Sequence, residues 1–182
     1  DDRRRQNGVL GFATVTTVLT SIVLSVVLFL VAPAITSRTL QEPALTTVIQ
    51  LFSVAMPFQA MTRVVSSSFR GIESPLDRAV VSGTSHLLRL ALVGGAVVLG
   101  YTLVGATAAY ALSTATALLV AIVLLFSRTE LRPARPVDRE HVRELLNYSL
   151  PLTVSRGGNL LYNRVDLFMV GIFLGASDVG IY

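Results

Sequence analysis

Apolar residues dominate four long stretches of the chain, and short polar connections separate them. The first stretch, Val9 to Ala32, carries no charged residue over its whole length. A hydrocarbon core about 30 Å thick needs about 20 residues of helix to cross it, and each stretch reaches that length. The pattern therefore predicts an all-α chain, a polytopic transmembrane helical bundle with spans at residues 9–32, 43–70, 78–99 and 103–126.

Prolines and a glycine indicate where the first two spans begin, bend and end. Pro33 is expected to end the first span, and Pro43 to open the second at a position where proline is tolerated. Pro57 falls inside the second span and removes one backbone hydrogen bond, so we expect a kink or hinge there. Gly71 is expected to end that helix.

The third span combines a cap with a polar stripe. Ser74 and Asp77 flank Pro75 in a pattern typical of a helix N-terminus. Within the span, four polar residues recur at helical spacing, which places them on one face of an otherwise apolar helix. We expect the histidine of this stripe to be packed and hydrogen-bonded. The four residues are Ser82, Ser85, His86 and Arg89.

A turn at Gly100–Thr102 leads into the fourth span, which has a face of small residues. Small side chains let neighbouring helices approach closely in a membrane, so this face is expected to pack against another helix. Its residues are Gly105, Ala108, Ala109, Ser113 and Ala117.

The stretch from residue 127 to 147 is the most polar part of the chain. Pro133 and Pro136 exclude a helix at its start, and an amphipathic helix is expected after Asp138. That pattern is typical of a helix lying in the membrane interface, although a solvated linker helix would show it too. Leu150 to about Ala176 is expected to form a fifth span.

Composition agrees with a membrane protein and excludes several other classes. Hydrophobic residues make up 52% of the chain and charged residues 14%, whereas soluble domains carry about 25% charged residues. The absence of cysteine excludes disulfides and zinc–thiolate sites, and the two histidines offer no metal spacing. No nucleotide-binding or hydrolase motif is present. We therefore expect no enzyme activity, no metal and no cofactor.

All fifteen basic residues are arginines, and their distribution predicts an orientation. With the N-terminal end in the cytoplasm, eleven of them fall on the cytoplasmic side and only Arg38 on the other side. This bias follows the positive-inside rule, so the net charge of +4 indicates a membrane surface rather than nucleic acid. The loop at residues 127–149 is then cytoplasmic. The eleven are Arg3, Arg4, Arg5, Arg63, Arg70, Arg78, Arg128, Arg132, Arg135, Arg139 and Arg143.

Charged residues inside the predicted spans indicate a cavity. Arg89, Arg156, Arg164 and Asp166 would each cost about 2.5–3.5 kcal/mol at mid-membrane if they faced lipid. A wet cavity lowers that cost, and guanidinium groups bind phosphate in a bidentate way. These residues therefore predict an anion cavity, in which Asp166 either pairs with Arg89 or holds a cation or proton. Alternatively, the charges only pair with one another and hold helices together.

The C-terminal part of the chain resembles a known family. The resemblance rests on Ser149-Leu150-Pro151, on Arg164-Val165-Asp166 and on the closing stretch LGASDVGIY, Leu174 to Tyr182. Similar motifs surround the seventh helix in the polysaccharide-transport branch of the multidrug/oligosaccharidyl-lipid/polysaccharide exporter superfamily. The match is specific over residues 139–182, and residues 1–138 are compatible with it in helix number, loop lengths and arginine bias.

The resemblance implies a two-lobed transporter of about twelve to fourteen helices, of which this chain is expected to be a fragment. The first lobe would end within residues 1–127, followed by a loop and interfacial helix at 128–149 and the first helix of the second lobe at 150–182. The implied activity is alternating access of a lipid-linked oligosaccharide, a phosphate or pyrophosphate polyprenol, across the cytoplasmic membrane. Membrane lipid is the other implied partner, and coupling to a cation or a proton stays open.

The expected site follows from these interpretations. Two other functions stay open: a cation-coupled drug or metabolite exporter, whose cavity would be dominated by carboxylates, and a non-transporting membrane scaffold, in which the intramembrane arginines would be replaceable. The expected hinge residues are Pro57, Gly157 and Gly158. The expected substrate-cavity residues are Arg89, Arg156, Asn159, Asn163, Arg164 and Asp166.

Overall fold

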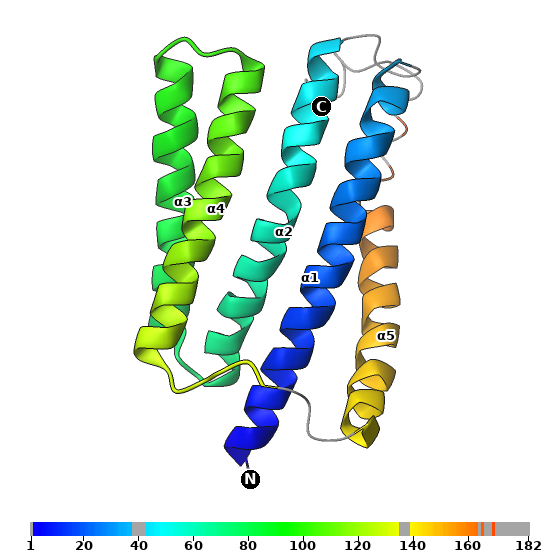
Figure 1. Ribbon diagram of the computed structural model, residues 1–182, viewed down its shortest axis with the longest axis vertical. Coiled ribbons are helices and arrows are strands. Elements are labelled where there is room, and N and C mark those ends of the chain that lie inside the picture. The colour runs from blue at the N-terminus through cyan, green and yellow to red at the C-terminus, as the bar shows by residue number, and fades with distance from the viewer. Residues whose placement is uncertain (1, 38–42, 135–138, 164, 166–168, 170–182) are drawn as a thin grey trace. The chain divides into compact units, whose positions relative to one another are not determined.

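The computed structural model of the chain is built from helices. It describes residues 2–37, 43–134, 139–163, 165 and 169, and within these ranges every regular element is helical, which confirms the predicted all-α class. The chain divides into two compact units, Asp1–Pro136 and Val137–Tyr182. The helices shown in Figure 1 are α1 (Asp2–Ile35), α2 (Pro43–Gly71), α3 (Pro75–Val98), α4 (Leu103–Arg128) and α5 (Arg139–Tyr162).

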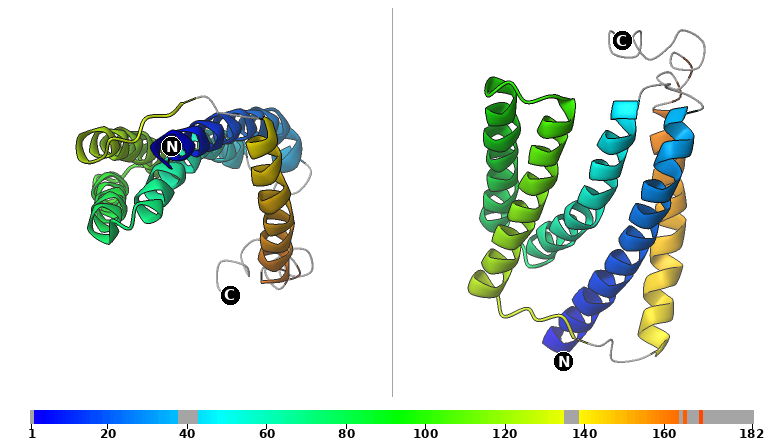
Figure 2. Two further views of the ribbon diagram at one scale, coloured as in Figure 1. Left: turned by 90° about the horizontal axis from the view of Figure 1, so that it is seen from below. Right: turned by 45° about the horizontal axis from the view of Figure 1, so that its top comes forward.

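The first unit is an up-and-down bundle in which α2 occupies the centre. Figures 1 and 2 show α1 on one side of α2 and the α3–α4 pair on the other. α2 packs against α1 and α4 along much of its length and touches α3 more sparingly. Because α2 contacts all three neighbours, its polar residues are the ones that can meet side chains from the rest of the unit.

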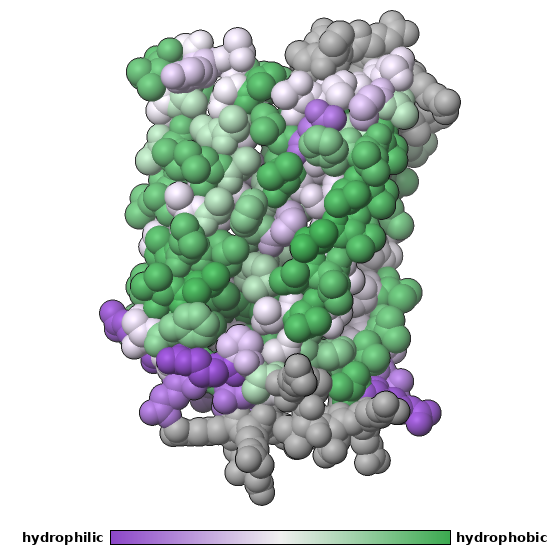
Figure 3. Space-filling view, in the orientation of Figure 1, coloured by the Kyte–Doolittle hydropathy of each residue, from purple (hydrophilic) through white to green (hydrophobic). Residues whose placement is uncertain are grey.

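Helices α1 to α4 are all long and apolar enough to cross a membrane. The candidate spans are Gln6–Ile35, Leu45–Gly71, Pro75–Val98 and Leu103–Arg128, which confirms the four predicted spans. Large apolar side chains face outward along them, as the green surface of Figure 3 shows. Such exposure would be unfavourable in water over so large an area, whereas lipid tails solvate it. The chain is therefore a multi-pass membrane protein.

One end of the first unit carries the arginines. The start of α1, the α2–α3 turn and the end of α4 all lie at this end, where Arg70, Arg78 and Arg128 are exposed (Figure 1). Hydrophilic side chains gather at the same end in Figure 3. The arrangement matches the predicted arginine bias, and the membrane side on which this end lies stays a prediction.

Several helix ends differ from those that the sequence predicts. Pro33 does not end α1, which continues to Ile35, because a proline in the last turn interrupts only one hydrogen bond. α3 begins at Pro75 instead of residue 78, and Ser74 precedes it. The Ser74 hydroxyl donates to Asp77 Oδ2 at 2.6 Å and makes no hydrogen bond to a helix N–H, so it is not the predicted backbone cap.

Pro57 lies inside α2, as predicted, and its effect reaches α1. A proline has no N–H, so the carbonyl four residues earlier loses its helical partner. That carbonyl belongs to Ser53, a residue with no exposed surface, and it accepts a 2.7 Å hydrogen bond from the Ser25 hydroxyl of α1. Figure 2 shows α2 curving along its length without a break. The proline thus frees an acceptor that a neighbouring helix uses.

A second polar contact joins the same two helices nearer their other end. The hydroxyls of Thr36 and Thr46 lie 2.5 Å apart, and Thr36 also donates locally, to the backbone of its own helix. We call the Ser25–Ser53 and Thr36–Thr46 contacts together the α1–α2 seam. Both polar pairs in this seam are satisfied within the protein.

An apolar core fills the arginine-rich end of the first unit. Phe69 is fully buried there among residues from all four helices. The segment after α4 crosses α1 at this end, where Asn7 accepts from the backbone N–H groups of Arg132 (2.9 Å) and Ala134 (3.0 Å). Gly11 makes the crossing possible, since a Cβ there would overlap the Ala134 carbonyl. The core residues are Leu10, Val65, Phe69, Val81, Ala121 and Leu125.

The small-residue face of α4 is partly as predicted. Ser113 and Ala117 are buried, and the buried stripe continues through Ala121 and Leu125 toward the arginine-rich end. Ala108 is exposed, so it does not belong to the packed face. The turn before α4 is confirmed, with Gly100 at φ 77°, a conformation that glycine adopts without strain.

In the second unit, α5 continues through Pro151 as one helix, whereas the sequence predicts two helical segments here. Its first half carries the polar residues of the predicted interfacial helix, and whether it lies in the interface stays a prediction. So does the fifth span, because residues 170–182 lie outside the described part of the chain. A Cβ at Gly157 or Gly158 would meet no described atom within 4 Å, and their role as hinges is likewise untested.

Candidate functional site

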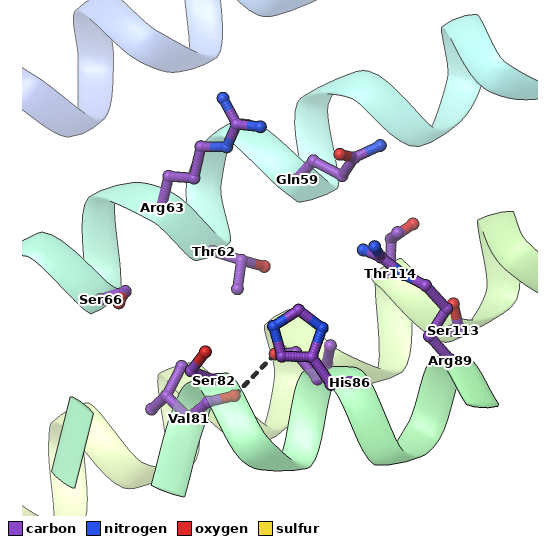
Figure 4. Close-up of a pocket in the computed structure, with 12 residues that line it drawn as sticks. Gln59, Thr62, Arg63, Ser66, Val81, Ser82, His86, Arg89, Ser113 and Thr114 are labelled. Carbon is purple, nitrogen blue, oxygen red and sulfur yellow. Dashed lines mark hydrogen bonds between the residues drawn. The ribbon is translucent and has the colours of Figure 1, made fainter. Parts of the chain in front are cut away.

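A polar pocket of about 330 Å³ opens between α2, α3 and α4. It lies next to the apolar core, with which it shares Val81. Figure 4 shows side chains from the three helices converging on the gap, and we call this site the polar pocket. Its lining residues are Gln59, Thr62, Arg63 and Ser66 of α2, Val81, Ser82, Ser85, His86 and Arg89 of α3, and Ser113, Thr114 and Ala117 of α4.

The polar stripe predicted on α3 forms one wall of this pocket. Ser82, Ser85, His86 and Arg89 all line it, so the helical spacing correctly placed them on one face. His86 differs from the expectation of a packed histidine. Its side chain is exposed and stands toward α2 in Figure 4. The reason is that α3 touches α2 only sparingly, which leaves the imidazole in open space between the two helices.

Arg89 is held by an aromatic pair. Its guanidinium carbon lies 4.8 Å from the centroid of the Tyr110 ring, a cation–π geometry. Tyr110 in turn packs against Phe52 of α2, with ring centroids 5.1 Å apart and tilted by 57°. These contacts hold one face of the guanidinium group, and Figure 4 shows its tip directed toward the gap.

Among the described residues, the donors of Arg89 have no protein partner. Its Nε atom is buried and unsatisfied, and within the described ranges no hydrogen bond or ion pair to this guanidinium is found. Leaving a buried donor unpaired costs about 1–3 kcal/mol, and more for a charged group. Arg89 sits 14 residues into the 24-residue helix α3, far from either end. An unpaired guanidinium at this depth would be stabilised by an anionic partner.

The pocket contains no acidic residue among those that line it. Asp77 is the only carboxylate within the four candidate spans, and it lies twelve residues from Arg89, about 18 Å along α3. It is also engaged by Ser74. No carboxylate among the lining residues compensates the charge of Arg89, which makes the site suited to anions and unsuited to cations.

Several pocket hydroxyls are already used by the backbone. Thr62, Ser113 and Thr114 each donate to a carbonyl of their own helix at 2.7–2.8 Å, as Ser85 also does at 2.7 Å. Such back-bonding satisfies a hydroxyl in a membrane helix without an interhelical partner. The donors that face the gap are then arginine, imidazole, amide and the remaining serine groups.

Tyr110 is a site residue that the sequence analysis does not predict. The structure places it against Arg89 within the bundle. A signal exists in the spacing: Arg89 lies nine residues before the end of α3, and Tyr110 seven residues after the start of α4. Antiparallel helices joined by a short turn bring residues at similar distances from that turn to nearby levels.

The other predicted cavity residues belong to the second unit. Arg156 and Asn159 are exposed on α5, and the N–H of Asn163 donates to the Asn159 carbonyl at 2.9 Å. Arg164 and Asp166 lie outside the described residues, and so does the predicted pairing of Asp166 with Arg89. The structure thus brings Arg89 together with residues of α2 and α4, and the roles of the α5 residues stay predictions.

Comparison with known protein families gives a match over nearly the whole chain. Residues 3–182 match the family described as Polysaccharide biosynthesis protein. No curated protein and no solved structure shows significant similarity to the chain. The match extends over the four spans as well as the motifs at the C-terminal end, and it confirms the resemblance to the polysaccharide-transport branch. The chain, with its four candidate spans and its arginine-lined polar pocket, belongs to the polysaccharide biosynthesis protein family.

Proposed function

We propose that the chain is part of a flippase, not an enzyme, that moves a lipid-linked oligosaccharide across the cytoplasmic membrane by alternating access. The substrate is a glycan joined to a polyprenol through phosphate or pyrophosphate. Its polyprenol tail stays in the bilayer while its charged, sugar-bearing head crosses. Membership of the polysaccharide biosynthesis protein family supports this proposal.

The observation that carries the proposal is Arg89. A guanidinium at mid-span costs several kcal/mol if it faces lipid, and a protein that uses it only for packing would pair it with a carboxylate. Here no acidic residue lines the pocket, and the group faces a polar gap. An anionic head group passing through the membrane supplies the missing charge.

Two rival functions predict different surroundings for Arg89. A cation-coupled drug or metabolite exporter needs carboxylates in its cavity. No carboxylate is among the residues that line the polar pocket. A non-transporting scaffold would satisfy Arg89 inside the bundle, whereas its Nε has no partner within the described part of the chain. Both comparisons favour a carrier of anions.

We further propose that the arginine-rich end is cytoplasmic, with the loop at residues 127–149 on that side. In the whole transporter, Arg156, Arg164 and Asp166 would line the cavity between the two lobes, next to the polyprenol phosphate. Pro57, Gly157 and Gly158 would permit the helix bending that alternating access requires. These assignments rest on the family resemblance and on the arginine bias.

Export of surface glycan by the full-length protein tests the proposal. Arg89→Ala should reduce surface glycan more than tenfold at a normal level of membrane protein, and the lipid-linked intermediate should accumulate inside the cell. Arg78→Ala is the matched control, because this exposed arginine sits on the same helix but outside the pocket. Unchanged export by the Arg89 variant would contradict the flippase proposal.

A further inference from the structure

A second pocket, of about 260 Å³, lies at the arginine-rich end of the first unit. It opens where three candidate spans end, because Gln6 begins the span of α1, Gly71 ends that of α2 and Arg128 ends that of α4. The ends of spanning helices lie at the level of the lipid head groups. We call this site the boundary pocket, and its lining residues are Gln6, Asn7, Ile72, Arg128, Thr129, Glu130 and Leu131.

One wall of the boundary pocket, the segment after α4, is fastened to the bundle. Leu131 packs against the apolar core, and the backbone N–H of Arg132 donates to Asn7 Oδ1 at 2.9 Å. The Arg132 guanidinium is engaged outside the pocket: it lies 4.8 Å from the centroid of the Phe126 ring and donates to the Leu131 carbonyl at 3.0 Å. The pocket is therefore preformed, and the guanidinium that lines it belongs to Arg128.

The hydrogen bond to Arg132 also fixes the orientation of the Asn7 amide. A backbone N–H needs an acceptor, so the Asn7 oxygen faces Arg132 and the NH2 group stands at the other end of the amide. Within the described ranges no hydrogen bond uses this NH2 group, and Gln6 lines the same pocket with a second amide. Amide and guanidinium donors together suit a phosphate group.

The boundary pocket differs from the polar pocket in carrying both signs of charge. Arg128 supplies a guanidinium and Glu130 a carboxylate, and both side chains are exposed. A carboxylate has about four acceptor positions, so Glu130 can receive a hydrogen-bond donor besides any contact that it makes within the chain. A fitting ligand thus has a phosphate for Arg128 and, attached to it, a donor group for Glu130.

Bilayer phospholipids have this chemistry at this depth. In phosphatidylethanolamine the group attached to the phosphate ends in an ammonium, and in phosphatidylglycerol it ends in hydroxyls. We propose that the boundary pocket binds the head group of a bilayer phospholipid, with its phosphate on Arg128 and Asn7 and its donor group on Glu130. This lipid is a resident of the membrane, not the transported substrate, so the inference goes beyond the proposed function.

The volume of the boundary pocket agrees with one head group. A water molecule occupies about 30 Å³ in the liquid, so the 260 Å³ hold about nine groups of that size. A phosphoethanolamine group has about eight non-hydrogen atoms and a phosphoglycerol group about ten, whereas a chain of several sugars is far larger. Ile72 and Leu131 give the pocket an apolar part, against which the glycerol backbone of the lipid can pack.

Native mass spectrometry of the purified, delipidated full-length protein measures the binding. Phosphatidylethanolamine, phosphatidylglycerol and phosphatidylcholine are titrated separately. Phosphatidylcholine is the reference, because it has the same phosphate but its methylated ammonium donates no N–H or O–H hydrogen bond. We expect the wild type to bind at least one of the other two lipids at least fivefold more tightly than phosphatidylcholine.

The arms of this titration identify the donor. Tight binding of phosphatidylethanolamine alone identifies an ammonium, tight binding of phosphatidylglycerol alone identifies a hydroxyl, and tight binding of both means that Glu130 accepts either donor. Each of these results supports the inference. No preference over phosphatidylcholine, or no bound lipid at all, would overturn it.

Variants of the two charged residues test the contacts. Arg128→Ala should bind the preferred lipid at least fivefold more weakly, and Glu130→Gln should lose most of the preference over phosphatidylcholine. Arg70→Ala is the matched control, because this exposed arginine lies at the same end but outside the pocket. Equal losses in the Arg128 and Arg70 variants would indicate only a general attraction to charge and would overturn the site.

A third variant tests the amide without disturbing the wall. Asn7→Asp keeps an acceptor for the Arg132 N–H but replaces the NH2 donor by a charged oxygen, so it should bind the lipid severalfold more weakly at an unchanged melting temperature. Wild-type affinity would contradict the contact between Asn7 and the phosphate. Because neither transport nor a sugar-bearing lipid enters these measurements, failure of the flippase proposal leaves this inference intact, and the reverse also holds.

Discussion

The α1–α2 seam and the polar pocket are both polar regions inside one membrane bundle, yet they treat their polar groups in opposite ways. In the seam, Ser25 satisfies the carbonyl that Pro57 frees, and two threonine hydroxyls contact each other. In the pocket, Arg89 finds an aromatic ring but no hydrogen-bond acceptor in the part of the chain that the structure describes. The satisfied groups of the seam join two helices, whereas the unsatisfied guanidinium belongs to the binding site proposed above.

The largest effect is expected when the charged side chain of the pocket, Arg89, is replaced by an apolar one. Arg89→Leu should lower glycan export more than tenfold, while the free energy of unfolding of the purified protein stays the same or rises by about 1 kcal/mol. The reason is that the substitution removes a buried donor that has no partner. Export assays and denaturant titration in detergent measure the two quantities.

This variant can break the comparison. If Arg89→Leu strongly destabilised the protein while export per folded molecule stayed normal, Arg89 would be a structural group like those of the seam.

A smaller effect is expected from the ring behind Arg89. Tyr110→Leu removes a cation–π contact worth about 1 kcal/mol, so we expect export to fall about fivefold. Tyr110→Phe is the matched control, because it keeps the ring and loses only the hydroxyl. Equal losses in both variants would show that the hydroxyl, and not the ring face, supports Arg89.

The seam should respond in stability and not in export. Ser25→Ala leaves the Ser53 carbonyl without a partner and should lower the free energy of unfolding by about 1 kcal/mol. Ser21→Ala is the control, since this hydroxyl bonds only to Val18 of its own helix. Unfolding of each variant in a detergent series provides the measurement.

Combining Ser25→Ala with Pro57→Ala tests whether the proline and the Ser25 hydroxyl are coupled. It returns an N–H to the Ser53 carbonyl, so Ser25→Ala should cost little in the Pro57→Ala background. If the effects of the two substitutions on the free energy of unfolding simply added, the inferred coupling between Pro57 and the Ser25 hydroxyl would be contradicted.

The smallest expected effect lies at the outer end of the seam. Thr46→Val removes the contact with Thr36 and should lower the free energy of unfolding by about 0.5 kcal/mol, since Thr36 keeps its bond to the Ala32 carbonyl. Thr47→Val, at the exposed neighbouring position, should change it less. An effect as large as that of Ser25→Ala would mean that both seam contacts contribute equally.

Much of the architecture was predictable because it depends on local chemistry. Long apolar runs must form helices in lipid, where every backbone group needs an internal partner. The polar stripe of α3 follows from spacing alone, and the extension of α2 to Gly71 follows from its glycine. The family, too, was visible in short motifs near the C-terminal end.

The errors arise where a residue's neighbours decide. Pro33 does not end α1, because the last turn of the helix tolerates a proline. Ala108 faces outward because of the rotation of α4 about its axis. His86 is exposed because α2 and α3 stay apart at its level. Each outcome depends on helix rotation and separation, which a single sequence does not state.

The sequence by itself determined that this is a membrane protein with arginines gathered at one end, and that one arginine of α3 lies where no charge is tolerated without a partner. Only the tertiary structure decided what surrounds that arginine. A tyrosine 21 residues away contacts one face of its guanidinium group. Hydroxyls of two further helices line the same pocket, and no carboxylate is among the lining residues. Hydrophobicity acts residue by residue and is legible along a chain, whereas the pairing of polar groups requires knowing which helix faces which.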